Sequence, residues 1–140
     1  MLARLVTVML VGSALSLLVF QMRAVSKSSH KACENGEQVS FRRDVLPALQ
    51  ASCASCHYSD EIIPPLNLTS VAAYKSIVGK KSSFVDAPLV KLGDPQGSFL
   101  VEKIGKNPRF GQQMPPYGRP LRARELNLLI DWVKQGAKNN

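Results

Sequence analysis

Along the chain after residue 38, apolar side chains recur at the spacing of an α-helix. The clearest case is 123–135, in which four apolar residues fall at i, i+3, i+4 and i+7: Leu126, Leu129, Ile130 and Val133. Gly136 follows as a natural helix stop, whereas Arg122 stands at the N-cap position, where Ser, Thr or Asp is usual. No stretch shows a convincing strand-like alternation. The pattern predicts an all-α fold whose last helix is the most regular.

Three shorter helices are expected earlier in the chain. The first covers 39–52, where Pro47 lacks an N–H and predicts either a kink or a fresh first turn capped by Asp44 or Leu46. The residues 58–66 include two adjacent prolines and are expected to form a loop.

The second of these helices is expected over 70–78, with Thr69 as its N-cap. The third is expected over 95–104, because Asp94 is a good N-cap and the proline after it suits the first helical position. Between this helix and the last one, 107–120 is rich in proline and glycine and predicts a long loop. A loop of this length in a small domain is usually functional or disordered.

The first residues of the chain differ in composition from the rest. A basic start that ends at Arg4 precedes 5–20, a run of sixteen residues without a charge, which lies between a signal-peptide core and a full membrane span. We expect 1–26 to be a signal peptide or an N-terminal membrane anchor, 27–38 a linker, and 39–140 one domain. The domain is then periplasmic, either soluble after cleavage or anchored to the inner membrane.

The exported part of the chain is basic. From Lys27 onward, 16 Lys and Arg stand against 10 Asp and Glu, a difference of +6. Such a surface can steer a small protein to an acidic docking face or to anionic lipid, and it equally suits plain solubility. Nucleic acid is not expected as a partner, because the chain is exported and carries no recognisable binding motif.

The most specific signal is the run Cys53-Ala54-Ser55-Cys56-His57. It reads C-x-x-C-H, the attachment sequence for a c-type haem. Two thiols one helical turn apart can both reach the vinyl groups of a single porphyrin as thioethers. A histidine directly after the second cysteine places an imidazole nitrogen beneath the iron as its proximal ligand. The run therefore predicts one covalently bound haem c, held by Cys53, Cys56 and His57.

Two other interpretations of these cysteines fit less well. A thioredoxin-like redox pair requires a strand-to-helix turn in a βαβ unit, and no β-rich run precedes Cys53. A structural zinc site requires a second ligand pair, and only His30 and Cys33 remain, both upstream in a polar stretch. If Cys53 and Cys56 bind haem, Cys33 has no partner thiol in this chain, which is expected to lie in an oxidising compartment. It is expected to form a disulfide with another chain or to stay free.

The second axial ligand decides what a c-type haem does, because Met or His makes an electron carrier and an open site permits ligand chemistry. Of the four methionines, three lie in the leader, and the fourth is Met114 in the long loop before the last helix. Prolines directly after it stiffen the loop and allow the thioether to be presented at small entropic cost. We therefore predict Met114 as the distal iron ligand, in preference to a role as core filler.

Several short motifs flank the pentapeptide. They are Phe41-x-x-Asp44-Val45-Leu46-Pro47-x-Leu49, Leu66-x-Leu68, Gly93-Asp94-Pro95-x-x-Ser98-x-Leu100, Met114-Pro115-Pro116 and Leu129-x-x-Trp132-Val133-x-x-Gly136-Ala137. Over 39–137 the chain resembles the monohaem class I cytochromes c, and more closely the cytochrome c domain described as planctomycete-type. The resemblance implies about four short helices around one haem. It also implies His57 and Met114 as axial ligands, and terminal helices that cross against each other.

The expected function is single-electron transfer between redox partners outside the cytoplasmic membrane. Catalysis by this chain alone is not expected, because no general base, second metal or nucleophile accompanies the haem motif. Two alternatives stay open: a haem-based ligand-binding or sensor module with a displaceable Met114, and an electron-entry subunit of a membrane oxidoreductase complex. Three aromatic residues are candidates for haem packing or for hydrogen bonds to its propionates, or for a plain core role: Phe110, Tyr117 and Trp132.

Overall fold

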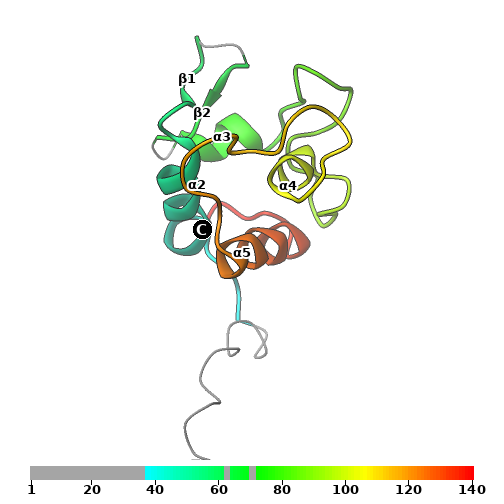
Figure 1. Cartoon of the computed structure of the whole chain (residues 1–140). Helices are drawn as coiled ribbons and strands as arrows, with labels where there is room; N and C mark the ends of the chain where they lie inside the picture. The colour runs from blue at the N-terminus through cyan, green and yellow to red at the C-terminus, as the bar shows by residue number, and fades with distance from the viewer. Residues whose placement is uncertain (1–36, 62–63, 70–71) are drawn as a thin grey trace, which may run out of the picture. The chain divides into compact units, whose positions relative to one another are not determined.

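The computed structural model describes residues 37–61, 64–69 and 72–140, which belong to one compact unit, Glu37–Asn140 (Figure 1). The expected leader 1–26 and the expected linker up to residue 36 lie outside the described residues, as do His30 and Cys33. Within the described residues, no helix has both the length and the apolar character needed to cross a membrane.

Seven elements follow one another along the described chain. They are η1 (Phe41–Val45), α2 (Leu46–Cys53), β1 (Tyr58–Ser59), β2 (Leu66–Asn67), α3 (Ala73–Ile77), α4 (Phe99–Ile104) and α5 (Ala123–Lys134). The α-helices are short except α5, whose bounds match the predicted 123–135 to one residue.

The first helical segment breaks where Pro47 predicts a fresh turn. A single π-helical turn, η1, gives way to α2, with Pro47 in the first turn of α2, where a missing N–H breaks no intrahelical hydrogen bond. The predicted caps are wrong. The N-cap of α2 is Val45, and the Asp44 carboxylate instead accepts a hydrogen bond from the Ser40 N–H at the start of η1, at 2.8 Å.

The starts of α3 and α4 also differ from the prediction. Thr69 does not cap α3, because its hydroxyl donates to Asn67 Oδ1 at 2.7 Å and the helix begins only after Ala72. Asp94 does not cap α4 either. Its Oδ1 accepts from the Gly97 N–H at 2.9 Å and closes a turn, so that the helix begins after Ser98. In both places a local side-chain hydrogen bond competes with the helix start.

The capping of α5 is better than its sequence suggests. Arg122 is the N-cap residue, and its backbone N–H donates to Glu125 Oε2 at 2.8 Å. Glu125 is the third residue of the helix (N3), so this contact is one of the two hydrogen bonds of a capping box. The helix ends before Gly136, whose φ of +91° is a left-handed conformation that favours glycine.

The loop predicted over 58–66 contains a short strand pair that the sequence did not indicate. The two-residue strands β1 and β2 are antiparallel, with Tyr58 opposite Asn67 and Ser59 opposite Leu66. The carbonyl of His57 accepts from the Leu68 N–H at 2.8 Å and extends the pairing by one hydrogen bond. Strands of two residues are too short to produce a detectable alternation.

The core is centred on Trp132 of α5, whose side chain is fully buried. Its ring centroid lies 5.1 Å from that of Phe41 and 6.2 Å from that of Tyr74. The indole N–H donates to the Lys138 carbonyl at 2.9 Å, so burial leaves no polar atom of the ring unpaired. These rings join η1, α3 and α5, and α5 packs directly on η1.

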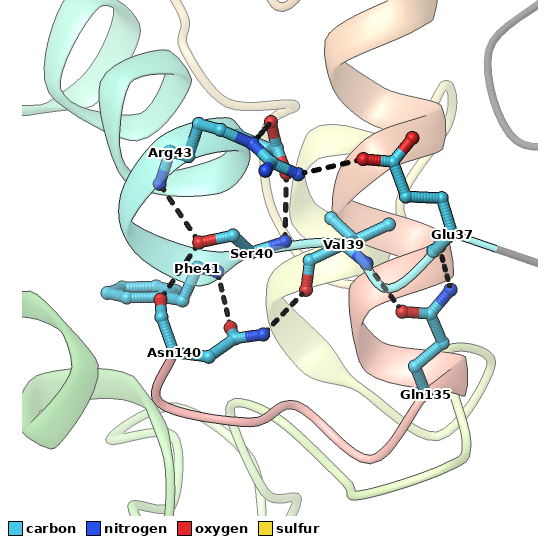
Figure 2. Close-up of polar contacts among 8 residues, drawn as sticks. Glu37, Val39, Ser40, Phe41, Arg43, Gln135 and Asn140 are labelled. Atoms are coloured by element: carbon cyan, nitrogen blue, oxygen red, sulfur yellow. Dashed lines mark hydrogen bonds and ion pairs between the residues drawn. The ribbon is translucent and has the colours of Figure 1, made fainter.

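Polar contacts hold the two ends of the described chain together (Figure 2). The side chain of Asn140 accepts from the Phe41 N–H at 2.8 Å and donates to the Val39 carbonyl at 3.3 Å. Its backbone carbonyl accepts from the Arg42 N–H at 3.0 Å. Gln135 adds a contact to the same segment, because its Oε1 accepts from the Val39 N–H at 2.7 Å.

Candidate functional site

The pentapeptide lies at the end of α2 and in the turn that follows. The helix ends at Cys53, and the Cys53 carbonyl then accepts from the Cys56 N–H at 3.2 Å and from the His57 N–H at 2.9 Å. This turn gives the three side chains different environments. Cys53 and His57 are half-buried, whereas Cys56 is exposed.

An open pocket brings three of the four predicted site residues together. Cys53, His57 and Met114 all line it, and Cys56 does not. The remaining lining comes from the β-strand region, the segment 81–89 and α4: Pro64, Pro65, Leu66, Leu68, Lys81, Ser82, Ser83, Phe84, Leu89, Phe99, Leu100, Lys103 and Ile104. The empty space is about 720 Å³, open mouth included, and its walls are mainly apolar. Cofactor sites are usually lined in this way, by apolar side chains with a small number of polar groups.

His57 carries an unpaired polar atom at this site. Its Nδ1 is buried and has no hydrogen-bond partner among the described residues. Burial lowers the pKa of the imidazole, which favours the neutral ring. A neutral imidazole is the form that binds a metal, and the ring nitrogen that does not bind usually forms a hydrogen bond that orients the ring.

The two thiols differ in their surroundings. Cys53 and Cys56 are both free. Burial, and secondarily the nearby Cys56, raises the pKa of the Cys53 thiol to about 11, so Cys53 is protonated at neutral pH. Neither cysteine is oxidised to a disulfide, and one of the pair already faces the pocket.

Met114 reaches the pocket from a loop that folds back onto α4. Its N–H donates to the Lys103 carbonyl at 2.7 Å, and the side chain of the preceding Gln113 donates to the Ile104 carbonyl at 3.0 Å. Met114 is half-buried, while Gln112 and Gln113 beside it are exposed. The peptide bond from Met114 to Pro115 is cis.

The second half of this loop connects the site to α2 and α5. Figure 1 shows the chain after α4 passing back across α2 before it enters α5. Arg119 marks the crossing, because its Nη1 donates to the buried Ser52 Oγ at 2.9 Å and its Nη2 donates to Glu125. Ser52 directly precedes Cys53, so the loop that presents Met114 is tied to the helix that presents Cys53.

The three aromatic candidates lie away from the pocket. Trp132 is in the core, and Phe110 and Tyr117 are 47% and 87% exposed and do not line the pocket. The structure instead places Phe99 and Lys103 there, two residues that sequence reasoning missed. Their spacing of four puts them on one face of a helix, but nothing in the sequence shows which face of α4 meets the pocket.

The residues present fit a haem. The pocket has mainly apolar walls, a buried imidazole nitrogen that lacks a partner among the described residues, and a soft thioether donor. In the described part of the chain, no three His, Cys, Asp or Glu side chains gather as a metal-binding group.

Comparison with known proteins adds no family. No protein-family model matches this chain, and neither the curated proteins nor the solved structures gave a match. The resemblance to planctomycete-type cytochrome c domains therefore stays a prediction from the sequence motifs.

Proposed function

We propose that this chain is a monohaem c-type cytochrome with a class I-like all-α fold, which carries single electrons between protein partners. The observation that carries the proposal is the meeting of Cys53, His57 and Met114 in one apolar pocket, although Met114 lies 57 positions from His57 in the sequence. When bound, the haem supplies a one-electron redox couple.

Each residue has a separate task in this proposal. Cys53 and Cys56 would hold the porphyrin covalently, and His57 and Met114 would supply an imidazole nitrogen and a thioether sulfur as ligands of the iron. A thioether ligand and an apolar surround favour the reduced state, which raises the potential relative to ligation by two histidines. Phe99 and its apolar neighbours exclude water from the site.

The surroundings of the pocket suit transfer to another protein. Phe84 lines the pocket and is 69% exposed, and Lys81 lines it as well, with its Nζ in an ion pair with the exposed Asp86 at 2.6 Å. We propose that redox partners with an acidic docking face approach here, in the periplasm or at the membrane surface.

The first test is the visible spectrum of the protein matured in a host with haem-attachment machinery. We compare the wild type, Met114→Ala, and Tyr117→Phe as a control in the same loop at an exposed position. The wild type should carry covalent haem and the weak far-red band of ferric haem with a methionine ligand. Met114→Ala should lose that band, have a lower potential and bind carbon monoxide when reduced. Tyr117→Phe should behave as the wild type.

Three results would contradict this proposal in different ways. A wild-type protein without covalent haem would show that the pentapeptide is not an attachment site. A wild-type spectrum that lacks the far-red band and shifts readily with carbon monoxide would support the ligand-binding or sensor module instead. An unchanged spectrum in Met114→Ala would show that another group is the distal ligand.

A further inference from the structure

Lys103 contacts the loop of Met114 through both its main chain and its side chain. It is the next-to-last residue of α4, and its carbonyl accepts the Met114 N–H at 2.7 Å. The same residue sends its side chain along the pocket, where its stem forms part of the wall. A single residue is therefore in contact with both the cavity and the backbone of the predicted iron ligand.

The ammonium group of Lys103 ends among loop carbonyls. Its Nζ donates to the Phe110 carbonyl at 2.9 Å and also to the carbonyl of Gln112. Hydrogen bonds from a charged donor are stronger than those between neutral groups. The two acceptors lie four and two positions before Met114, so the ammonium fixes the loop immediately ahead of the ligand.

Other contacts close the same loop on either side of the segment that Lys103 holds. The Arg109 N–H donates to Glu102 Oε1 at 2.9 Å, and Gln113 donates to the Ile104 carbonyl. Between these two contacts, the exposed segment 110–112 is held to α4 through Lys103. Gly111 is in a left-handed conformation there, with φ of +64°, and a Cβ at this position would lie 3.3 Å from Lys103 Nζ. Glycine, which has no Cβ, therefore suits a position that the Lys103 ammonium approaches so closely.

We propose that Lys103 is a positioning residue that keeps the Met114 sulfur on the iron. The inference rests on the proposed function, because it presumes that Met114 is the distal ligand. Lys103 does not bind the iron. It restricts the loop, and a ligand held in its binding position competes better with ligands from solution because less freedom is lost when it binds.

The test measures how readily an added ligand displaces Met114. Imidazole is titrated into the ferric, haem-loaded protein, and the visible spectrum is followed for the wild type, Lys103→Met, Lys106→Met and Met114→Ala. Lys103→Met keeps an apolar chain along the pocket wall and removes the ammonium. Lys106→Met removes the same charge at an exposed position nearby. Circular dichroism and the thermal midpoint show whether each variant is folded.

The expected result is a selective gain in imidazole affinity. Removing a charged hydrogen-bond donor should raise the affinity of Lys103→Met by about tenfold over the wild type, with its fold retained. Lys106→Met should stay within about twofold, since exposed charges at the surface contribute little. Met114→Ala should bind imidazole more tightly than any other variant.

Two results would overturn the inference, and they are distinguishable. If Met114→Ala opens the iron but Lys103→Met binds imidazole as the wild type does, Met114 is the ligand and Lys103 does not position it. If Met114→Ala itself has no effect, the proposed ligand is wrong, and the role of Lys103 is wrong with it.

If Lys103→Met does not accumulate as folded protein, native-state hydrogen exchange of the wild type tests whether Lys103 holds the loop of Met114. The Met114 amide donates to Lys103 and should exchange as slowly as the amides of α4. Fast exchange at Met114, with slow exchange in α4, would contradict the proposal.

Discussion

The contact of Asn140 with the start of η1 offers a sharp test of how the two ends of the domain stabilise each other (Figure 2). The Asn140 side chain accepts from the Phe41 N–H at 2.8 Å and donates to the Val39 carbonyl at 3.3 Å. Phe41 is 1% exposed and Val39 is 4% exposed. The perturbation is Asn140→Ala, which removes both side-chain contacts and leaves the backbone contact to Arg42 in place.

The magnitude follows from the two lost hydrogen bonds. Each contributes about 0.5–1.5 kcal/mol, and a first-turn N–H such as that of Phe41 has no intrahelical partner to replace the lost acceptor. Asn140→Ala should therefore lower the free energy of unfolding by about 2 kcal/mol. For a domain of this size the melting temperature should fall by roughly 8–16 °C.

The assay is urea or thermal unfolding of the haem-loaded protein, followed by far-ultraviolet circular dichroism. Asn139→Ala is the matched control, because it makes the same change at an exposed neighbouring residue and should alter stability by less than about 0.5 kcal/mol. Asn140→Asp keeps an acceptor for the Phe41 N–H and loses the donor to Val39. It should fall between the wild type and Asn140→Ala.

Equal stability of the two alanine variants would refute this reasoning. Such a result would mean that water replaces the Asn140 amide at no cost and that the ends of the domain are held by the aromatic core alone. A loss in Asn140→Asp as large as in Asn140→Ala would locate the whole effect at the Val39 contact.

Two further changes test the charge at η1 and the core. The hydrogen bond from Arg43 lowers the pKa of Asp44 in the folded protein. The Asp44 carboxylate therefore contributes its full stabilisation at pH values above its ordinary pKa of about 3.9. This contribution is lost as the pH falls through the lower pKa of the folded state. Asp44→Asn should therefore have a lower free energy of unfolding than the wild type at pH of about 7. Urea unfolding below pH of about 3 should show a smaller difference between the two proteins, and an equal difference at the two pH values would contradict this prediction. Trp132→Phe removes the hydrogen bond to Lys138 and part of a fully buried ring. It should cost about 2 kcal/mol in the same assay, against less than about 0.5 kcal/mol for Tyr117→Phe, and equal losses would contradict the assignment of Trp132 to the core.

Features that depend on neighbouring residues can be predicted from the sequence alone. Cys53, Cys56 and His57 are close along the chain, so any helical turn brings them together, and their spacing predicts the attachment chemistry without a fold. The helix α5 was predicted to within one residue because its apolar periodicity and the glycine after it are both local signals. Met114 was selected because it is the one methionine outside the expected leader.

Helix starts were predicted less well. Thr69 and Asp94 are good N-cap residues, yet each is engaged in a hydrogen bond with a nearby residue and neither caps a helix. Capping propensity says how often a residue type is found at an N-cap. Which N–H or side chain a particular Thr or Asp bonds depends on the turn that the chain forms there. Glu125 shows the opposite case, since a carboxylate three positions on supports a helix start at Arg122.

Only the tertiary structure decided which distant residues meet. Lys103 approaches Met114 because the loop between them folds back on α4, and Trp132 lies in the core because α5 packs on η1. The Asn140 amide reaches residues about a hundred positions earlier in the chain. Such contacts depend on how whole elements pack, and packing follows from the combined burial of many side chains, which no single stretch of sequence encodes.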